Sequence, residues 1–334
     1  MKFLHTADLH LGNSFPSEDP QRRSRYRRLR FQALEDISSA AVAHGVDYLF
    51  LVGDIFEEQK ISHREVVEVM ERLNRLPVKV FLLLGNHDYG LFDTLEAIKG
   101  KVHLFGPQSS VYVDHGRRVM IFGESWSRHS YGKEKLIDPS VFLEGYTKIL
   151  LHHGTWGGRG YFPLDPATFS GVFDYIALGH IHKGEELQSH VVMCGTPEIL
   201  SFDEVGDFGY ILGEGEGAIT TRRISRSSLQ VERVSLHSPE ELEELEQSPH
   251  LLYDIHYDGV PSDYLRSLIQ GNFPDSRVKF LPKSRFNYRE LYGRHRDDVV
   301  GAFIRKVRAM EGSEEYLEQL MDVGLSALMG GRDD

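Results

Sequence analysis

The sequence predicts an α/β sandwich that starts with a largely parallel sheet, and three observations support this fold class. Apolar runs of strand length alternate with helical patterns over the first 84 of the 334 residues, in the order strand, helix, strand, helix, strand. The runs at residues 47–52 and 78–84 are nearly continuous, as in strands that are buried on both faces. Polar residues of the kinds that bind metals follow several of these runs, at the edge where open α/β sheets bind ligands.

The elements of this part can be assigned in chain order. Residues 2–7 form the first expected strand, and residues 22–44 form a helix in which apolar side chains recur at helical spacing. A second helix is expected near residues 63–75, between the two buried strands. Further strand-like segments lie at 101–105, 111–114, 118–123, 148–154, 173–180, 190–195, 209–214 and 218–224.

The composition changes beyond this α/β part. Residues 238–249 are acidic and carry prolines at both ends, which is typical of a boundary, so the first domain is expected to span residues 1–237. A strand, helix, strand pattern then predicts a small α+β domain at residues 250–286. Residues 287–334 read as a helical tail.

The tail contains two apolar stripes at helical spacing. A small domain leaves little core for two more helices to cover, so the stripes either fold back onto their own domain or dock a partner. Both alternatives remain open from the sequence. The first stripe comprises Val299, Val300, Phe303, Ile304 and Val307, and the second comprises Leu317, Leu320, Met321, Leu325 and Leu328.

The charge balance limits how the protein could meet a polyanion. The net charge is −12, and such a surface repels nucleic acid unless a basic patch or bound metals intervene. The stretch "QRRSRYRRLR" at residues 21–30 holds six arginines, which either form a solvated helix face or contact phosphate. Arg22 and Arg23 are the candidate substrate contacts there. Trp156, in a glycine-rich loop, either packs against the fold or contacts the substrate.

Three features bear on the cellular compartment. No run of about 18 apolar residues is present, so no membrane span and no membrane partner is expected. The first residues show neither an apolar signal region nor a cleavage site. Cys194 is the only cysteine, which excludes an intrachain disulfide and fits a reducing environment. We therefore expect a cytoplasmic protein.

Five predicted strands end in carboxylate, amide or imidazole side chains. Convergence of five strand ends on one sheet edge is harder to explain by chance than any single motif, because each strand delivers its residues to the same place. The five ends carry Asp8 and His10; Asp54; Asn86, His87 and Asp88; His152 and His153; and His180 and His182.

This set of side chains suits two divalent metal ions about 3.5–4 Å apart, which can clamp the attacking and leaving oxygens of a phosphoryl transfer. Such a pair needs a bridging carboxylate, and Asp54 is the expected bridge. Mixed oxygen and imidazole ligands favour manganese, iron or zinc over magnesium or calcium. The first metal would take Asp8, His10 and His182, and the second would take Asn86, His152 and His180.

The order of the motifs carries a family resemblance. D-x-H, G-D, G-N-H-D, H and G-H-x-H occur in that order, and in this the sequence resembles the calcineurin-like metallophosphoesterases. The stretches "HTADLHLG", "GDIFE", "GNHDYG" and "IALGHIHKGEEL" resemble, within that superfamily, the SbcD family of DNA double-strand-break repair nucleases. The resemblance is strong over about residues 1–210 and continues weakly over 250–285.

The resemblance implies a specific fold and activity. The fold would be a four-layer α/β/β/α sandwich with a small α+β capping domain and a helical tail. The activity would be a two-metal DNA exonuclease or endonuclease in repair and recombination, with manganese as the expected metal, hydrolysing phosphodiesters with a metal-activated water. His87 would protonate the leaving oxygen or stabilise the transition state. The resemblance also implies a homodimer and an SbcC-like coiled-coil ATPase docked on the tail after about residue 290.

Two positions remain open beside the resemblance. Only one of His152 and His153 can face the metals because side chains alternate along a strand, and His152 is chosen since it aligns with the single histidine of relatives. Glu57 stands where many relatives carry His or Asp, which puts an exonuclease-related contact in question. Asp88 is expected to orient His87 or a backbone turn.

Two rival functions remain beside the nuclease. An enzyme of the same superfamily could act on cyclic nucleotides or other small phosphodiesters, and its metal ligands would be the same. A non-catalytic scaffold would have lost ligands, whereas every ligand position is filled here.

Overall fold

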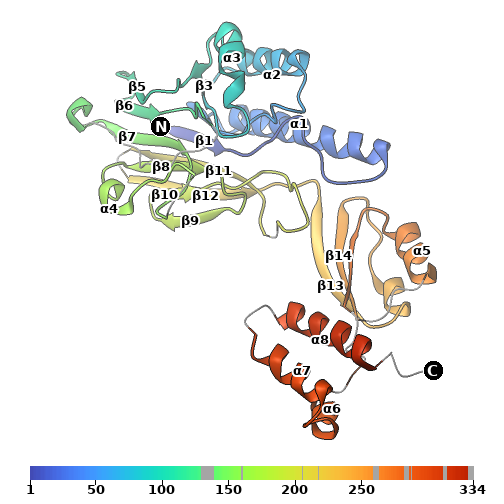
Figure 1. Cartoon of the computed structure of the whole chain (residues 1–334). Coiled ribbons are helices and arrows are strands. Elements are labelled where there is room, and N and C mark those ends of the chain that lie inside the picture. The colour runs from blue at the N-terminus through green and yellow to red at the C-terminus, as the bar shows by residue number, and fades with distance from the viewer. Residues whose placement is uncertain are drawn as a thin grey trace. The chain divides into compact units, whose positions relative to one another are not determined.

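The computed structural model describes most of the chain as two compact units (Figure 1). One unit comprises Met1–Val231 with Pro249–Leu252, and the other comprises Glu232–Ser248 with Tyr253–Asp334. The described residues are 1–128, 139–158, 161–204, 206–216, 218–258, 263–281, 286, 288–310 and 314–329.

The first sheet of the amino-terminal unit is six-stranded within the described residues, in the order β12-β11-β1-β2-β3-β4. Neighbouring strands from β1 to β4 are parallel, and β11 joins β1 antiparallel, so the sheet begins largely parallel as predicted. Its strands are β1 (Lys2–Thr6), β2 (Tyr48–Val52), β3 (Lys79–Leu83), β4 (His103–Leu104), β11 (Gly209–Glu216) and β12 (Ala218–Ser225).

The second sheet has the order β5-β6-β7-β8-β10-β9 over the same described part. The four strands β6, β7, β8 and β10 run parallel, and β5 and β9 close the two edges antiparallel. The strands are β5 (Ser110–Asp114), β6 (Val119–Gly123), β7 (Thr147–His153), β8 (Tyr175–Gly179), β9 (Glu185–Gln188) and β10 (Val191–Met193).

Strand periodicity divides the apolar residues between two cores. In β2, Phe50 and Val52 face the second sheet and pack in one cluster with Ile149 of β7. Leu49 and Leu51, which alternate with them, belong to the cluster under the helices. Both faces of β2 are therefore buried, which explains why its sequence is apolar throughout.

Helices cover the outer faces of the two sheets (Figure 1). The first sheet is covered by α1 (Pro20–Ala43), α2 (His63–Arg75) and α3 (Phe92–Ile98), the last preceded by the 3₁₀ turn η1 (Tyr89–Leu91). The second sheet carries the short α4 (Pro166–Phe169) and aromatic loop residues; the 3₁₀ turn η2 (Pro139–Val141) follows β6. The predicted four-layer α/β/β/α sandwich is confirmed, with a thin fourth layer in the described part.

Local sequence signals explain where these helices begin. Asp19 caps α1 by accepting a hydrogen bond from the backbone N–H of Gln21. Ser62 and Glu65 form a reciprocal capping box at the start of α2. Within the part of the chain that the structure describes, no helix is both long enough and apolar enough to cross a membrane.

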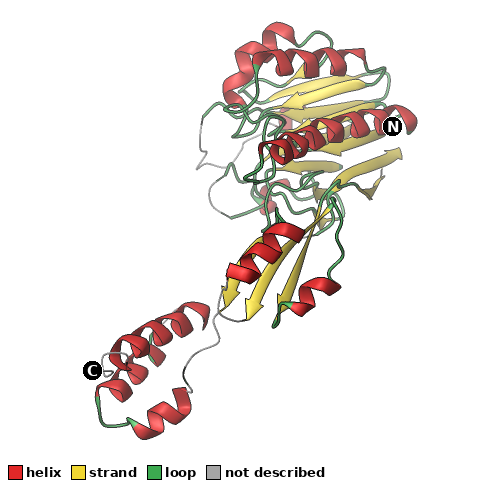
Figure 2. Cartoon of the chain, turned by 90° about the vertical axis from the view of Figure 1, so that its right-hand side faces the viewer, coloured by secondary structure: helices red, strands yellow, loops and turns green. Residues whose placement is uncertain are grey.

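The second unit contains a three-stranded sheet in the order β13-β14-β15 and the helix α5 beside it (Figure 2). The expected strand, helix, strand pattern corresponds to β14 (Leu251–Asp258), α5 (Asp263–Asn272) and β15 (Arg277–Leu281). The sheet also includes β13 (Gln230–Leu236), which precedes the acidic stretch and the 3₁₀ turn η3 (Glu240–Glu244). The second unit starts at Glu232, within β13.

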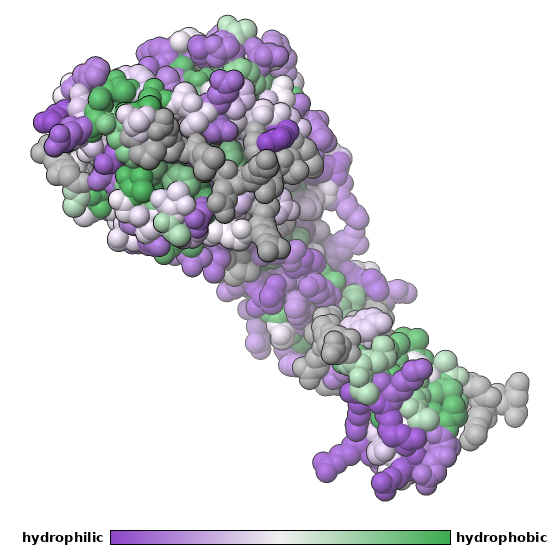
Figure 3. Space-filling model, turned by 60° about the vertical axis from the view of Figure 1, so that its left-hand side comes forward, coloured by the Kyte–Doolittle hydropathy of each residue, from purple (hydrophilic) through white to green (hydrophobic). Residues whose placement is uncertain are grey.

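The described residues of the tail form three helices, α6 (Tyr288–Arg294), α7 (Val299–Arg308) and α8 (Glu314–Met329). The two predicted apolar stripes face each other, because Ile304 and Val307 of α7 share one buried cluster with Met321 and Leu325 of α8. Figure 3 shows that hydrophobic residues also remain on the surface of this helical segment.

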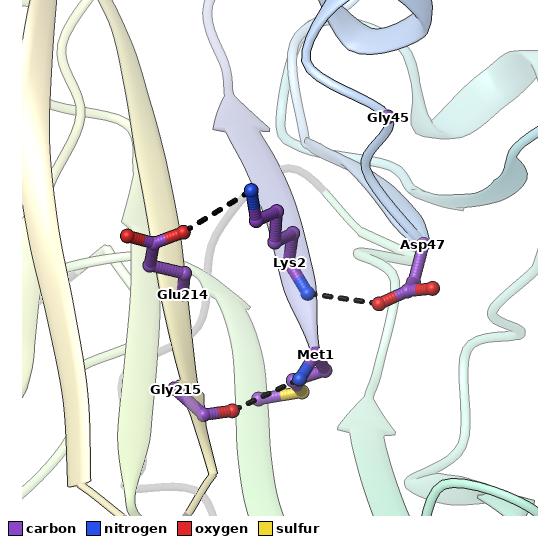
Figure 4. A pocket seen from close by; sticks show the side chains of 6 residues that line it. All are labelled: Met1, Lys2, Gly45, Asp47, Glu214 and Gly215. Carbon is purple, nitrogen blue, oxygen red and sulfur yellow. Dashed lines mark hydrogen bonds and ion pairs between the residues drawn. The ribbon is translucent and has the colours of Figure 1, made fainter.

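The amino-terminal end of β1 is tied to strands on both sides around a shallow pocket (Figure 4). The Lys2 backbone N–H donates to Asp47 Oδ2 at 2.9 Å, and the Met1 ammonium donates to the Gly215 carbonyl at 3.0 Å. Lys2 Nζ lies 3.4 Å from Glu214 Oε2. These contacts fix one end of β1, while the metal-binding residue types follow its other end.

His5 of β1 is fully buried between the two sheets and makes one contact through each ring nitrogen. Nδ1 lies 2.9 Å from the Tyr175 hydroxyl, and Nε2 lies 3.2 Å from the Leu178 carbonyl. A neutral imidazole satisfies both, accepting from the hydroxyl and donating to the carbonyl. Burial lowers the pKa of His5 from 6.5 to about 3, so this core requires the neutral ring.

His5 is expected to make folding sensitive to mild acid. The unfolded chain accepts a proton below pH 6.5 that folded His5 refuses until about pH 3, so its contribution to stability is lost as the pH falls through this window. Between pH 7.5 and 5.5 the free energy of unfolding should fall by about 1.4 kcal/mol more in the wild type than in His5→Gln. Urea unfolding at both pH values measures this difference, and equal losses in the two proteins would contradict it.

Candidate metal centre

The carboxyl ends of β1, β2, β3 and β8 bring six of the seven predicted metal-ligating residues to one edge of the sandwich, and the end of β7 adds His153. Asp8, Asp54 and Asn86 follow the ends of β1, β2 and β3 in the first sheet. His180 follows the end of β8, so the second sheet also contributes to this edge. Three overlapping groups have ligand atoms within 4.8 Å of one another. They are Asp8, His10 and His182; His10, Asp54 and His87; and Asp54, His153 and His180.

Asp54 lies at the centre of these groups. Its Oδ1 accepts a hydrogen bond of 2.8 Å from the backbone N–H of His87. Its Oδ2 lies 3.1 Å from His153 Nε2 and 3.9 Å from His10 Nε2. Asn86 extends the set, since its Oδ1 lies 3.1 Å from His180 Nδ1. The geometry therefore allows Asp54 to be shared between two cations, as the sequence predicts.

The backbone at this edge adopts conformations that bulky residues rarely use. Asp8, His10, Asp54 and His180 have φ values of 55°, 45°, 52° and 98°. The first two loops hold each other in place, because Asp8 N–H donates to the Gly53 carbonyl and His10 N–H donates to the Asp54 carbonyl. Such strain persists where the surrounding structure fixes it, which is common at functional sites.

Two glycines allow the ligand loops to approach closely. A Cβ at Gly53 would collide with the His153 ring, and a Cβ at Gly85 would collide with the Asp54 carboxylate. Gly53 also has a φ of 80°, a conformation that other residues adopt only under strain. The glycines of the G-D and G-N-H-D motifs are therefore required by the packing of the ligands behind them.

The structure places His153, and not the predicted His152, in this centre. His152 Nε2 instead donates to the Phe162 carbonyl at 2.6 Å, and its ring packs on Phe162. Side chains alternate along β7, so His153 points between the sheets with Ile149 and Leu151, whereas His152 points outward with Leu150. The sequence could not decide between His152 and His153, because β7 carries apolar residues on both faces.

His153 is held in its orientation by two further contacts. Its Nδ1 donates to the Val52 carbonyl at 2.8 Å, which turns Nε2 toward Asp54 Oδ2 at 3.1 Å. Trp126 Nε1 donates to the His153 carbonyl at 2.7 Å. His153 Nε2 is thus buried beside the Asp54 carboxylate, where a cation could be bound by both groups.

The strongest sign that the centre fits a cation is the approach of two histidine nitrogens. His10 Nε2 and His182 Nε2 lie 3.3 Å apart. Each ring turns its Nδ1 to a carboxylate, His182 to Glu204 Oε1 at 2.6 Å and His10 to Glu57 Oε2 at 3.4 Å. The carboxylates favour a proton on each Nδ1, so a divalent cation beside the buried Asp8 could take both Nε2 atoms as ligands in place of the hydrogen bond between them.

Glu57 joins two histidines at the mouth of the centre. Its Oε1 lies 3.2 Å from His87 Nδ1, while Oε2 faces His10. Hydrogen bonds from His10 and His87 lower the pKa of Glu57 to about 2. The Glu57 carboxylate in turn raises the pKa of His87, whose side chain is 44% exposed. From the sequence, Glu57 was identified only as a departure from relatives, and its contact with His87 was not predicted.

Asp88 holds a backbone turn, which was one of its two predicted roles. Its Oδ2 accepts hydrogen bonds from the N–H groups of Ile55 and Phe56 at 2.7 and 3.1 Å, and its Oδ1 accepts from Gly85 at 2.7 Å. The side chain is fully buried, and burial with the nearby Asp54 charge raises the pKa of Asp88 to about 7. Asp88 thus joins the loops that carry Asp54 and Asn86.

The structure does not bring the three predicted substrate contacts into the metal centre. Arg22 Nε lies 3.3 Å from Asp19 Oδ2, and Arg23 donates to the Ser17 and Glu18 carbonyls, so both turn back onto the start of α1. Trp156 packs against the outer core of the second sheet. An exposed aromatic does lie at the centre, because the Tyr161 ring is 4.8 Å from the His180 ring. No motif pointed to Tyr161 or Glu204.

Comparison with known proteins places this geometry in context. A family model described as calcineurin-like phosphoesterase matches residues 1–184. The uncharacterized metallophosphoesterase YhaO of Bacillus subtilis is 29% identical over 232 residues, which cover 64% of this chain and 57% of that protein.

One protein named for DNA repair and one named as a nuclease subunit are also similar to this chain. The DNA double-strand break repair protein Mre11 of Methanocaldococcus jannaschii is 26% identical over 229 residues, covering 62% of this chain and 59% of that protein. The SbcD subunit of the nuclease SbcCD of Escherichia coli is 25% identical over 269 residues, covering 63% of this chain and 64% of that protein. The chain thus spans less than two thirds of the length of each of these three relatives.

Proposed function

This chain belongs to the calcineurin-like phosphoesterase family, and we propose that it is a metal-dependent DNA nuclease acting in double-strand-break repair. The observation that carries the proposal is the pair of facing nitrogens, His10 Nε2 and His182 Nε2, beside buried Asp8 and Asp54. The similarity to Mre11 and to the SbcD subunit of SbcCD supports DNA as the substrate class.

The residues present fit two divalent cations that share Asp54. Bound there, the cations would neutralise charge on a phosphodiester and lower the pKa of water. We propose manganese, with iron or zinc as alternatives, because the donors are mixed oxygen and imidazole groups without thiolates. One cation would take Asp8, His10 and His182, and the other would take Asn86, His153 and His180.

His87 is the proposed general acid. Its ring lies at the edge of the centre, 4.8 Å from the His10 ring, and is half exposed to an incoming substrate. Glu57 accepts the Nδ1 proton, which orients the ring so that Nε2 can point toward substrate. Glu57 raises the pKa of His87, which favours the protonated ring, and transfer of the Nε2 proton to the leaving oxygen would release the cleaved strand.

Cleavage assays with manganese test the nuclease and the role of His87. Wild type should cleave linear duplex or single-stranded DNA, and His87→Ala should lower kcat by about 10²–10⁴-fold with metal still bound. His44→Ala is the matched control, because His44 is an exposed histidine at the end of α1.

Two outcomes would redirect the proposal. Absence of DNA cleavage by metal-loaded wild type would contradict the nuclease, and faster hydrolysis of cyclic AMP or bis-nitrophenyl phosphate would favour a small-phosphodiester enzyme. Equal activity of wild type and His87→Ala would contradict only the acid role of His87.

We further propose that α7 and α8 dock an SbcC-like coiled-coil ATPase. The similar SbcD protein is by its name one subunit of a larger nuclease, which supports such a partner. After α7 and α8 have packed on each other, Val299 and Val323 remain 63% and 70% exposed, which leaves apolar surface for a partner.

Co-purification with the SbcC-like ATPase of the same organism tests this docking surface. The double variant Val299→Asp, Val323→Asp should lose the ATPase, because two charges would be buried on docking. Val42→Asp on α1 is the control, since Val42 is 45% exposed outside the tail. Full retention of the ATPase by the double variant would show that it docks elsewhere.

A further inference from the structure

Glu204 lies outside every sequence motif, in the connection between β10 and β11, yet it contacts the metal centre. Its Oε1 is 2.6 Å from His182 Nδ1, and its Oε2 accepts a hydrogen bond of 2.6 Å from the Leu200 N–H. We infer that Glu204 is a positioning residue for one of the two proposed cations, because it holds His182 with Nε2 toward Asp8 and His10. The inference rests on the proposed function only in that the centre binds divalent cations.

The segment that carries Glu204 is anchored to the loop that carries Asp8. Thr196 Oγ1 donates to the Asp8 carbonyl at 2.8 Å. The buried Arg30 of α1 donates to the Ile199 carbonyl at 2.6 Å and to the Leu9 carbonyl at 3.3 Å. Residues 196–204 are therefore held against the loop that carries Asp8, and these contacts fix the backbone from which Glu204 extends.

A carboxylate at Nδ1 has two consequences for His182. It favours the proton on Nδ1, so that Nε2, which lies 3.3 Å from His10 Nε2 and 4.0 Å from Asp8 Oδ1, is the nitrogen available to a cation. It also makes the imidazole a stronger ligand, because the Glu204 carboxylate raises the basicity of the ring nitrogen that would bind the cation. Removing such a partner typically lowers metal affinity by about 10–100-fold.

The effect should be confined to one cation. The other proposed set has two histidines: His153 donates its Nδ1 proton to the neutral Val52 carbonyl, and His180 Nδ1 faces the Asn86 amide oxygen. Glu204 contacts neither of these histidines in the part of the chain that the structure describes. The two cations would therefore differ in their dependence on an outer carboxylate, and only the one held by Asp8, His10 and His182 depends on Glu204.

Manganese titration of the metal-free protein, without substrate, tests the inference. Calorimetry on wild type should resolve two bound ions, and Glu204→Gln should weaken one of them by about 10–100-fold and leave the other unchanged. Gln retains an oxygen that can accept from Leu200 but lacks the charge on His182. Asp207→Asn, an exposed acid in the same connection, should bind as wild type does.

A double-mutant cycle separates positioning from a structural role. If Glu204 acts through His182, then Glu204→Gln should cause no further loss of manganese affinity in a His182→Gln background. Unchanged affinity in Glu204→Gln, or equal weakening of both ions, would overturn the inference. Failure of wild type to bind manganese would instead overturn the proposed function.

Discussion

The arrangement of this protein depends on one buried carboxylate, Asp54, at the edge where its two sheets meet. Burial works against the ionised form of Asp54, and the neighbouring His153 and His10 lower its pKa below the ordinary value despite that. The side chain is tied to the next loop through the His87 N–H, and its backbone carbonyl accepts from His10. Residues from three loops and both sheets are thus held around one negative charge.

Three neighbouring carboxylates hold the loops and histidines in place around this charge. Asp88 ties the Asp54 loop to the Asn86 loop through backbone N–H groups. Glu57 and Glu204 turn two histidines so that their Nε2 atoms face inward. The fold therefore concentrates its local strain and buried polar contacts at one edge, which is typical of a site that binds and acts.

The sequence predicted the edge but not every residue at it. Asp8, Asp54 and His180 were identified because each follows an apolar strand, a pattern that depends only on chain order. His152 and His153 could not be separated in this way, since β7 is buried on both faces and its apolar residues carry no inside or outside signal. Glu204 lies in an irregular connection, where side-chain direction depends on tertiary contacts such as that between Arg30 and Ile199.

Elements with a clear pattern of apolar residues were predicted well. The mostly exposed and charged strand β13 was not. β1, β2, β3 and α2 were assigned within a few residues because their buried faces are apolar. β13 was not assigned to the small sheet, because its residues are mostly exposed and partly charged. The arginines at residues 22–30 show a second limit of sequence analysis. Arg23 and the buried Arg30 both donate to backbone carbonyls, which composition alone does not reveal.

Anomalous diffraction from a crystal soaked in manganese would test the central claim most directly. Two peaks about 3.5–4 Å apart should appear, with Asp54 between them and with His153 as a ligand. A lone peak away from Asp54, or coordination by His152 in place of His153, would contradict the account.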